Sequence, residues 1–145
     1  MTYSKNWKPV EKFFGIPVTL FGPISKNKTR SIIQLIPSEA KALRHTDAEL
    51  KAFNRTYPEK KKKWLKERHG SLLSFLPAAL EKNDRKEKMV VAGLAYRLGE
   101  NAFTEKTYYV NCHEKLVQLK VLVPIGETKS LDEADRIVRS FQCEK

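Results

Sequence analysis

The sequence lacks the signatures of the common catalytic and membrane-spanning classes. It contains no G-x-S-x-G, no glycine-rich phosphate loop, no H-E-x-x-H and no C-x-x-C. Its longest apolar run is far shorter than the roughly 20 residues that a helix needs to cross a bilayer. The first 15 residues hold no apolar segment after a basic start, so no signal peptide is visible. These absences argue against the familiar hydrolase and nucleotide-binding classes and against a membrane helix.

Histidine is also scarce. His45, His69 and His113 lie far apart in the sequence, each beside a predicted element end, where an exposed loop histidine is the ordinary case. Cys112 precedes His113 directly, but adjacent strand residues point to opposite faces, so the two side chains would not readily meet as nucleophile and base. We therefore predict that the chain is not an enzyme and has no catalytic residue, metal site or cofactor. A hydrolase with an unrecognised site ranks last.

The chain has 145 residues and a large positive charge that is unevenly distributed. There are 28 Lys and Arg against 17 Asp and Glu, which gives +11. Residues 1–40 carry +6 and −2, residues 41–88 carry +14 and −7, and residues 89–145 carry +8 and −8. The excess is therefore regional, as expected of a charged surface. The length and the 41% hydrophobic content predict a single domain over residues 1–145.

The N-terminal part has the pattern of a β-hairpin. Two apolar runs, "FFGIPVTLFGP" and "RSIIQLIP", flank the polar connector "ISKNKT". Pro17 removes a donor from the first run, which predicts that this strand is at a sheet edge or contains a bulge.

The middle of the chain has helical periodicity. Thr46 and Glu49 have the spacing of a capping box at the start of "TDAELKAFNRTY". Pro58 fits the first turn of a second helix or a kink, and Gly70 fits a left-handed C-cap. The following "SLLSFLPAAL" is compatible with a strand or a short helix, and "EKNDRKEK" is a charged connector.

The last third predicts a three-stranded meander covered by a helix. The strands are expected near residues 89–98, 106–112 and 116–123, where β-branched and aromatic residues predominate. An apolar stripe at helical spacing predicts a helix over 131–141 that packs on the sheet, with Ser130 and Glu133 as its capping box and Phe141 in the stripe. The resulting fold class is α+β, an antiparallel sheet with helices packed on it.

The segment "EKKKKWLKERHG" supplies the candidate binding site. On a helix its basic side chains cannot share one face, because successive residues step by about 100°. One interpretation is a solvated helix anchored through Trp64 and Leu65. The other is a binding patch for an anionic partner. The candidate residues are Lys60, Lys61, Lys62, Lys63, Lys66 and Arg68.

Two cysteines stand near the ends of predicted elements. Cys112 ends a strand and Cys143 follows the last helix. One interpretation is a disulfide, which would indicate an oxidising compartment. The other is a pair of buried free thiols.

The order of elements near the C-terminus resembles that of the PsbP-like and DcrB-like group. The resemblance is in "VVAGLAYRLGENAFTEKTYYVNCHEKLVQLKVLVP" and the helix "DEADRIVRSF", about residues 88–143, with a generic N-terminal hairpin; the lysine-rich middle does not align. It implies an α/β/α sandwich serving as an accessory or binding domain without a cofactor or catalytic group, often in a bacterial envelope or thylakoid lumen. It supplies no site residues.

These observations lead to two functional hypotheses. The first is a non-enzymatic periplasmic or secreted accessory protein, its leader absent from this chain, that acts through its surface on a protein or an anionic cell-envelope polymer. The second is a cytoplasmic nucleic-acid-binding module that uses the basic segment 60–68. Nucleic acid is the less favoured partner, because no recognition motif surrounds the adjacent tyrosines Tyr108 and Tyr109.

Overall fold

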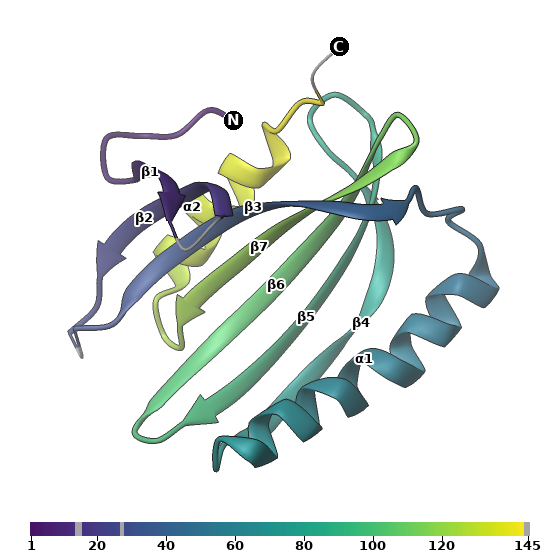
Figure 1. Ribbon diagram of the computed structural model, residues 1–145. Coiled ribbons are helices and arrows are strands. Elements are labelled where there is room, and N and C mark those ends of the chain that lie inside the picture. The colour runs from purple at the N-terminus through teal and green to yellow at the C-terminus, as the bar shows by residue number, and fades with distance from the viewer. Residues whose placement is uncertain (14–15, 27, 144–145) are drawn as a thin grey trace.

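In the part of the chain that the structure describes, seven strands form one antiparallel sheet (Figure 1). The computed structural model describes residues 1–13, 16–26 and 28–143. The strand order is β1-β2-β3-β7-β6-β5-β4. The strands are β1 (Lys8–Phe13), β2 (Ile16–Ile24), β3 (Arg30–Lys41), β4 (Ser71–Lys82), β5 (Lys88–Leu98), β6 (Asn101–Cys112) and β7 (Lys115–Pro124). The N-terminal hairpin thus joins the C-terminal meander through the pairing of β3 with β7.

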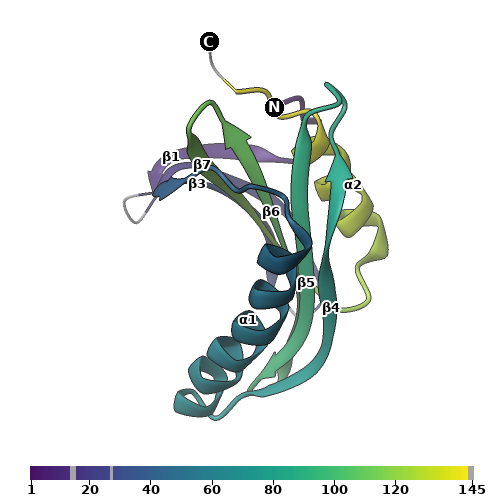
Figure 2. The same cartoon turned by 90° about the vertical axis from the view of Figure 1, so that its right-hand side faces the viewer.

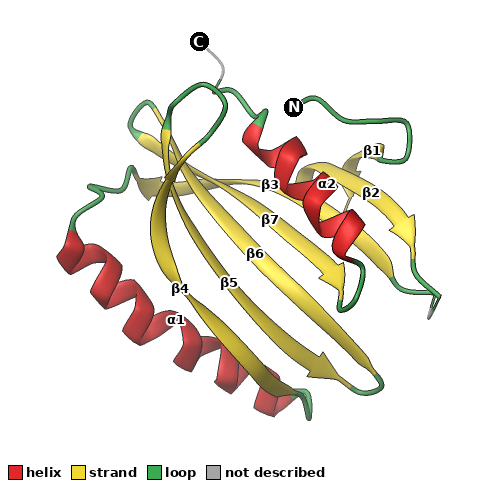
Figure 3. Cartoon of the chain, turned by 180° about the vertical axis from the view of Figure 1, so that it is seen from behind, coloured by secondary structure: helices red, strands yellow, loops and turns green. Residues whose placement is uncertain are grey.

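Two helices cover opposite faces of this sheet. The longer, α1 (Asp47–Glu67), runs alongside β4 and β5, whereas α2 (Thr128–Arg139) lies on the other face (Figures 2 and 3). Within the described residues, neither helix is long and apolar enough to cross a membrane. The α+β class, the antiparallel sheet and its helical cover are therefore confirmed.

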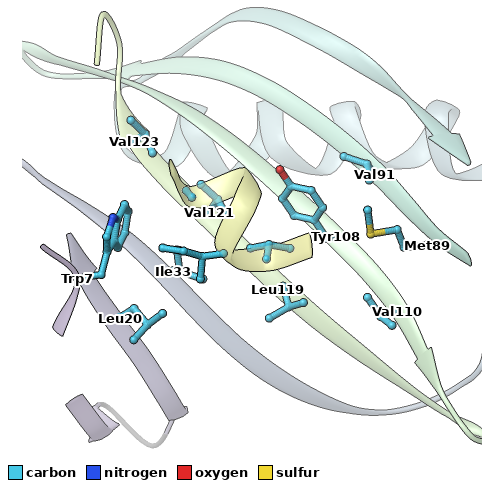
Figure 4. Close-up of a cluster of buried hydrophobic side chains, with 13 residues drawn as sticks. Trp7, Leu20, Ile33, Met89, Val91, Tyr108, Val110, Leu119, Val121 and Val123 are labelled. Atoms are coloured by element: carbon cyan, nitrogen blue, oxygen red, sulfur yellow. The ribbon is translucent and has the colours of Figure 1, made fainter. Parts of the chain in front are cut away.

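The main core lies between α2 and the sheet (Figure 4). It is built from alternate residues of β5, β6 and β7, because successive strand residues point to opposite faces. Ala134, Ile137 and Val138 of α2 close it, as the apolar stripe predicts. Trp7 adds the largest side chain and is 1% exposed. The core strands contribute Leu20, Ile33, Met89, Val91, Tyr108, Val110, Leu119, Val121 and Val123.

Polar contacts fix α2 in place. The hydroxyl of Tyr108 donates to Oδ1 of Asp135 at 2.6 Å, and Nε of Arg139 donates to Oδ2 of the same carboxylate at 2.8 Å. Arg139 also reaches Oε1 of Glu81 on β4 at 2.6 Å. Burial raises the pKa of Tyr108, and its hydrogen bond to Asp135 raises that pKa further, so this phenol remains a donor. These contacts stabilise the packing of α2 on the sheet.

The predicted start of α2 is wrong. The helix begins at Thr128, its N-cap is Glu127, and no side chain caps it. Ser130 is buried within the first turn. Glu133 does not complete a capping box with Ser130; its Oε2 accepts a hydrogen bond from the indole Nε1 of Trp7 at 2.9 Å. The helix also ends at Arg139, so Phe141 packs against the core from the following segment.

The predicted cap of α1 is present in an altered form. Oγ1 of Thr46 accepts from the backbone N–H of Glu49 at 3.2 Å, as a capping box requires. The carboxylate of Glu49 does not return to Thr46. It accepts from the backbone N–H groups of Arg44 and His45 at 3.1 and 3.2 Å. The side chain therefore orders the chain that leads into the helix.

The end of α1 differs from the prediction by one residue. Pro58 lies inside one continuous helix, so two separate helices are not formed. His69, not Gly70, takes the left-handed conformation, with φ of 57°. The N–H groups of His69 and Gly70 bond to the carbonyls of Lys66 and Leu65, which is the Schellman pattern. Gly70 serves close packing, because a Cβ there would lie 2.7 Å from the carbonyl oxygen of Arg97.

Strand assignments at the two edges also differ from expectation. The sequence pattern did not predict β1, which forms one edge and places β2 inside the sheet. The edge position expected from Pro17 is therefore wrong, although the β2–β3 pairing does contain an irregularity, between Phe21 and Ile24. The ambiguous segment after α1 is the edge strand β4, a position that tolerates Pro77. The meander is confirmed, with β6 beginning earlier, at Asn101.

Cys112 and Cys143 form the predicted disulfide. Their Cα atoms are 5.3 Å apart, and 31 positions separate them in the sequence. The bond joins the end of β6 to the segment that follows α2.

Candidate functional site

A groove lies between α1 and the part of the sheet that α1 leaves uncovered. The helix packs on β4 and β5 through Leu65, Tyr57 and Phe53. The same face of β6, β7 and β3 continues beyond it, and the resulting hollow has a volume of about 620 Å³. Its lining consists of Ile32, Gln34, Tyr57, Lys60, Lys61, Trp64, Tyr96, Leu98, Phe103, Glu105, Lys120 and Leu122.

Strand register explains why these residues face the groove. Glu105 of β6 pairs with Leu122 of β7, which pairs in turn with Ile32 of β3. Paired residues share a face, and so do residues two positions apart along a strand. Phe103 and Lys120 therefore join the same surface. The alternate residues of these strands form the core beneath α2.

A buried carboxylate occupies the floor of the groove. Glu105 is 3% exposed. Its Oε1 lies 3.2 Å from Nζ of Lys61 and 3.4 Å from Nζ of Lys120. Its Oε2 accepts a hydrogen bond from the hydroxyl of Tyr57 at 3.0 Å. The charge is thus matched by ammonium groups from both the helix and the sheet.

Aromatic side chains form the wall around this cluster. The rings of Trp64 and Tyr96 meet edge to face at 6.0 Å, and Tyr96 lies 5.8 Å from Phe103. Nζ of Lys61 lies 4.1 Å from the ring centre of Trp64 and 4.4 Å from that of Tyr96. Both distances are within the range of cation–π attraction. Lys61 is therefore held by a carboxylate and by two aromatic faces.

Burial and the charge of Glu105 shift the pKa values of the groups around it. Burial raises the pKa of Tyr57 and of Tyr96, and the charge of Glu105 raises both further, so neither phenol is a base at neutral pH. Burial lowers the pKa of Lys61, and its attraction to Glu105 opposes that effect. No group of three or more His, Cys, Asp and Glu side chains in the described part of the chain is arranged to hold a metal ion.

The predicted basic cluster is divided between two surfaces. Lys61 points into the groove, where its side chain is 11% exposed, and Lys60 also lines the groove. Lys62, Lys63 and Lys66 are exposed on the side of α1 that faces away from the sheet. We call these three residues the outer basic face of α1. The last member of the cluster, Arg68, lies over the ring of Trp64 at 4.2 Å.

The three histidines lie at element boundaries, as expected. His45 precedes α1, His69 follows it, and His113 is in the turn between β6 and β7. All three have positive φ, at 59°, 57° and 61°. They serve as turn residues of three different connections.

Sequence reasoning did not identify Glu105 or Lys120 as site residues. Glu105 falls in "GENAFTE", which has the composition of a connector, and the structure makes most of it strand. Lys120 belongs to the polar face of a strand that is buried on its other side. The available signal in the sequence was a charged residue inside a stretch of β-branched and aromatic residues. The sequence does not show which residue of α1 pairs with it, because that contact forms only in the folded chain.

Comparison with known proteins supports the fold. No family model matches the sequence, and neither does any curated protein. Among solved structures, the chain is similar to the solution structure of cyanobacterial PsbP (CyanoP) from Synechocystis sp. PCC 6803, with a TM-score of 0.56 and 15% identity. The match covers 98% of this chain and 84% of that one, so it includes the lysine-rich helix. The chain therefore has a PsbP-like fold.

Proposed function

We propose that this protein is a non-enzymatic accessory protein that works outside the cytoplasm and binds an anionic partner, a protein or an envelope polymer, through the outer basic face of α1. The PsbP-like fold supports the accessory role, because the resemblance drawn from the sequence implies a domain without cofactor or catalytic group. Fold alone does not specify a partner, so the partner's class is inferred from the charge of the surface.

The arrangement of charge on α1 is the observation that carries this proposal. Lys62, Lys63 and Lys66 are exposed together, and of these only Lys62 has an ion pair with a described residue, a 3.2 Å contact with the exposed Glu59. Exposed pairs of this kind contribute little energy, so the helix does not need these lysines for stability. The ammonium groups of Lys63 and Lys66 have no ion pair with a described residue, and exposed positive charge of this kind attracts polyanions over long distances.

Replacing all three lysines of the outer basic face by glutamine is expected to weaken binding to heparin and to reduce its salt dependence. Each contact between an ammonium group and a polyanion releases counterions, and for duplex DNA the slope of log K against log salt is about −0.9 per contact. The measurement is affinity at several salt concentrations. The matched control, K82Q/K88Q/K115Q, removes the same charge from exposed strand ends. Equal changes in heparin affinity and salt dependence in the two variants would assign the effect to net charge. That result would refute binding through the outer basic face of α1.

The location outside the cytoplasm is supported by the disulfide. Structural disulfides persist in oxidising compartments and are rare in the cytosol. We expect Cys112 and Cys143 to resist alkylation in acid-quenched cells until a reductant is added, as measured by intact mass. Two thiols that alkylate before reduction would contradict this location. Combined with tighter binding to DNA than to heparin, that result would favour the nucleic-acid-binding alternative.

A further inference from the structure

We propose that the groove between α1 and the sheet binds one small amphipathic anion, with an apolar body against the walls and a single anionic head at Lys120 and Lys60. This site uses the sheet side of α1, whereas the proposed function uses the outer basic face. The two proposals are therefore independent.

The size and the walls of the groove specify the body of the ligand. A volume of about 620 Å³ lies within the range typical of small-molecule sites. Ile32, Trp64, Leu98, Phe103 and Leu122 all line it while remaining partly exposed, although each belongs to a helix or strand that is well packed elsewhere. Apolar surface left open in this way is removed from water when an apolar ligand binds. A purely polar anion would leave these walls unused.

The charge of the groove specifies the head. Its lining contains three ammonium groups, Lys60, Lys61 and Lys120, and one carboxylate, Glu105. Lys61 is the buried partner of that carboxylate, with a side chain that is 11% exposed. The side chain of Lys120 is 37% exposed although its Nζ lies 3.4 Å from the same carboxylate. Because one negative charge does not balance three positive ones, the groove favours an anionic head over a neutral or cationic one.

The position of the buried cluster indicates how the ligand is oriented. Glu105 and Lys61 hold the floor, and the rings of Trp64, Tyr96 and Phe103 are joined by edge-to-face and tilted contacts. The wall is thus formed before any ligand binds, which limits the entropy lost on binding. The ammonium groups of Lys60 and Lys120 are the ones available to a ligand's head, because their side chains are more exposed than that of Lys61.

Dodecanoate is a suitable probe, since it combines one carboxylate with an apolar chain. Calorimetric titration of the full chain below the micellar concentration is expected to show saturable binding of one molecule. Acetate should not compete, and dodecanol should bind more weakly. Indole emission should change on binding, because Trp64 lines the groove and Trp7 is buried on the other face of the sheet. Absence of saturable dodecanoate binding, or equal affinity for dodecanol, would overturn the proposal.

Two variants locate the site. Lys120→Gln should weaken dodecanoate binding by about three- to fivefold, the effect of losing one partly exposed ion pair. Lys115→Gln is the matched control, because it removes an exposed lysine from the start of the same strand, and it should leave affinity unchanged. Leu122→Glu places a second carboxylate in the lining and should reduce affinity more than tenfold in protein whose circular dichroism is native. Equal effects of the two lysine variants, or retained affinity in folded Leu122→Glu, would place the ligand elsewhere and refute the site.

Discussion

Replacing Glu105 by leucine is expected to destabilise the fold by about 3–5 kcal/mol, the range measured when one member of a buried ion pair is removed. The change leaves the ammonium group of Lys61 in the groove without its carboxylate, and it leaves the hydroxyl of Tyr57 without its acceptor. Chemical denaturation gives the free energy of unfolding. Glu100→Leu, at an exposed turn glutamate, is the control and should change stability by less than about 0.5 kcal/mol.

A double-mutant cycle separates the net contribution of the ion pair to stability from the penalty of leaving one buried charge unpaired. Lys61→Met combined with Glu105→Leu removes both charges while keeping similar volumes, and such replacements are often neutral or stabilising. Because the hydroxyl of Tyr57 also lacks its acceptor in the double variant, that variant should be less stable than the original protein but clearly more stable than the single Glu105→Leu variant. Strictly additive effects of the two substitutions would show that Lys61 and Glu105 are not coupled and that the groove floor is not held by their contact.

Removing the disulfide with Cys112→Ala and Cys143→Ala is expected to lower the free energy of unfolding by about 3.5 kcal/mol. The bond closes a loop spanning 31 positions, and its loss increases the conformational entropy of the unfolded chain. Thermal and denaturant unfolding measure the effect. Reduction of the original protein should produce the same shift, which controls for the packing of the substituted side chains. A loss below about 1 kcal/mol in both experiments would show that the unfolded chain gains little freedom.

Local signals predicted the parts of the fold that depend on neighbours in the sequence. The concentration of β-branched and aromatic residues located β5 and β7 closely, because such residues favour strands. Thr46 located the start of α1, since its hydroxyl meets an amide only three residues later. Both features follow from interactions that the sequence itself brings together.

Features that depend on distant residues were not predictable in this way. Glu133 has the spacing of a capping residue, but the indole of Trp7, 126 positions away, takes its carboxylate. The groove likewise needs β6 and β7 in register beside α1 before Glu105, Lys61 and Lys120 meet. The lysines of α1 are visible in the sequence. Only the packing of the helix on the sheet shows which of them line the groove and which form the outer basic face.

The pairing of β3 with β7 has a consequence for the newly made chain. Ile33 pairs with Val121, so the strand that completes one side of the N-terminal hairpin is synthesised 88 positions later. At ~5–20 residues per second, β7 is synthesised several seconds after β3, and the edge of β3 stays unpaired during that time. During that interval it exposes unpaired amides and carbonyls beside a run that contains Ile32, Ile33 and Ile36. Open apolar edges recruit other strands. Pairing with β7 covers this edge in the folded chain.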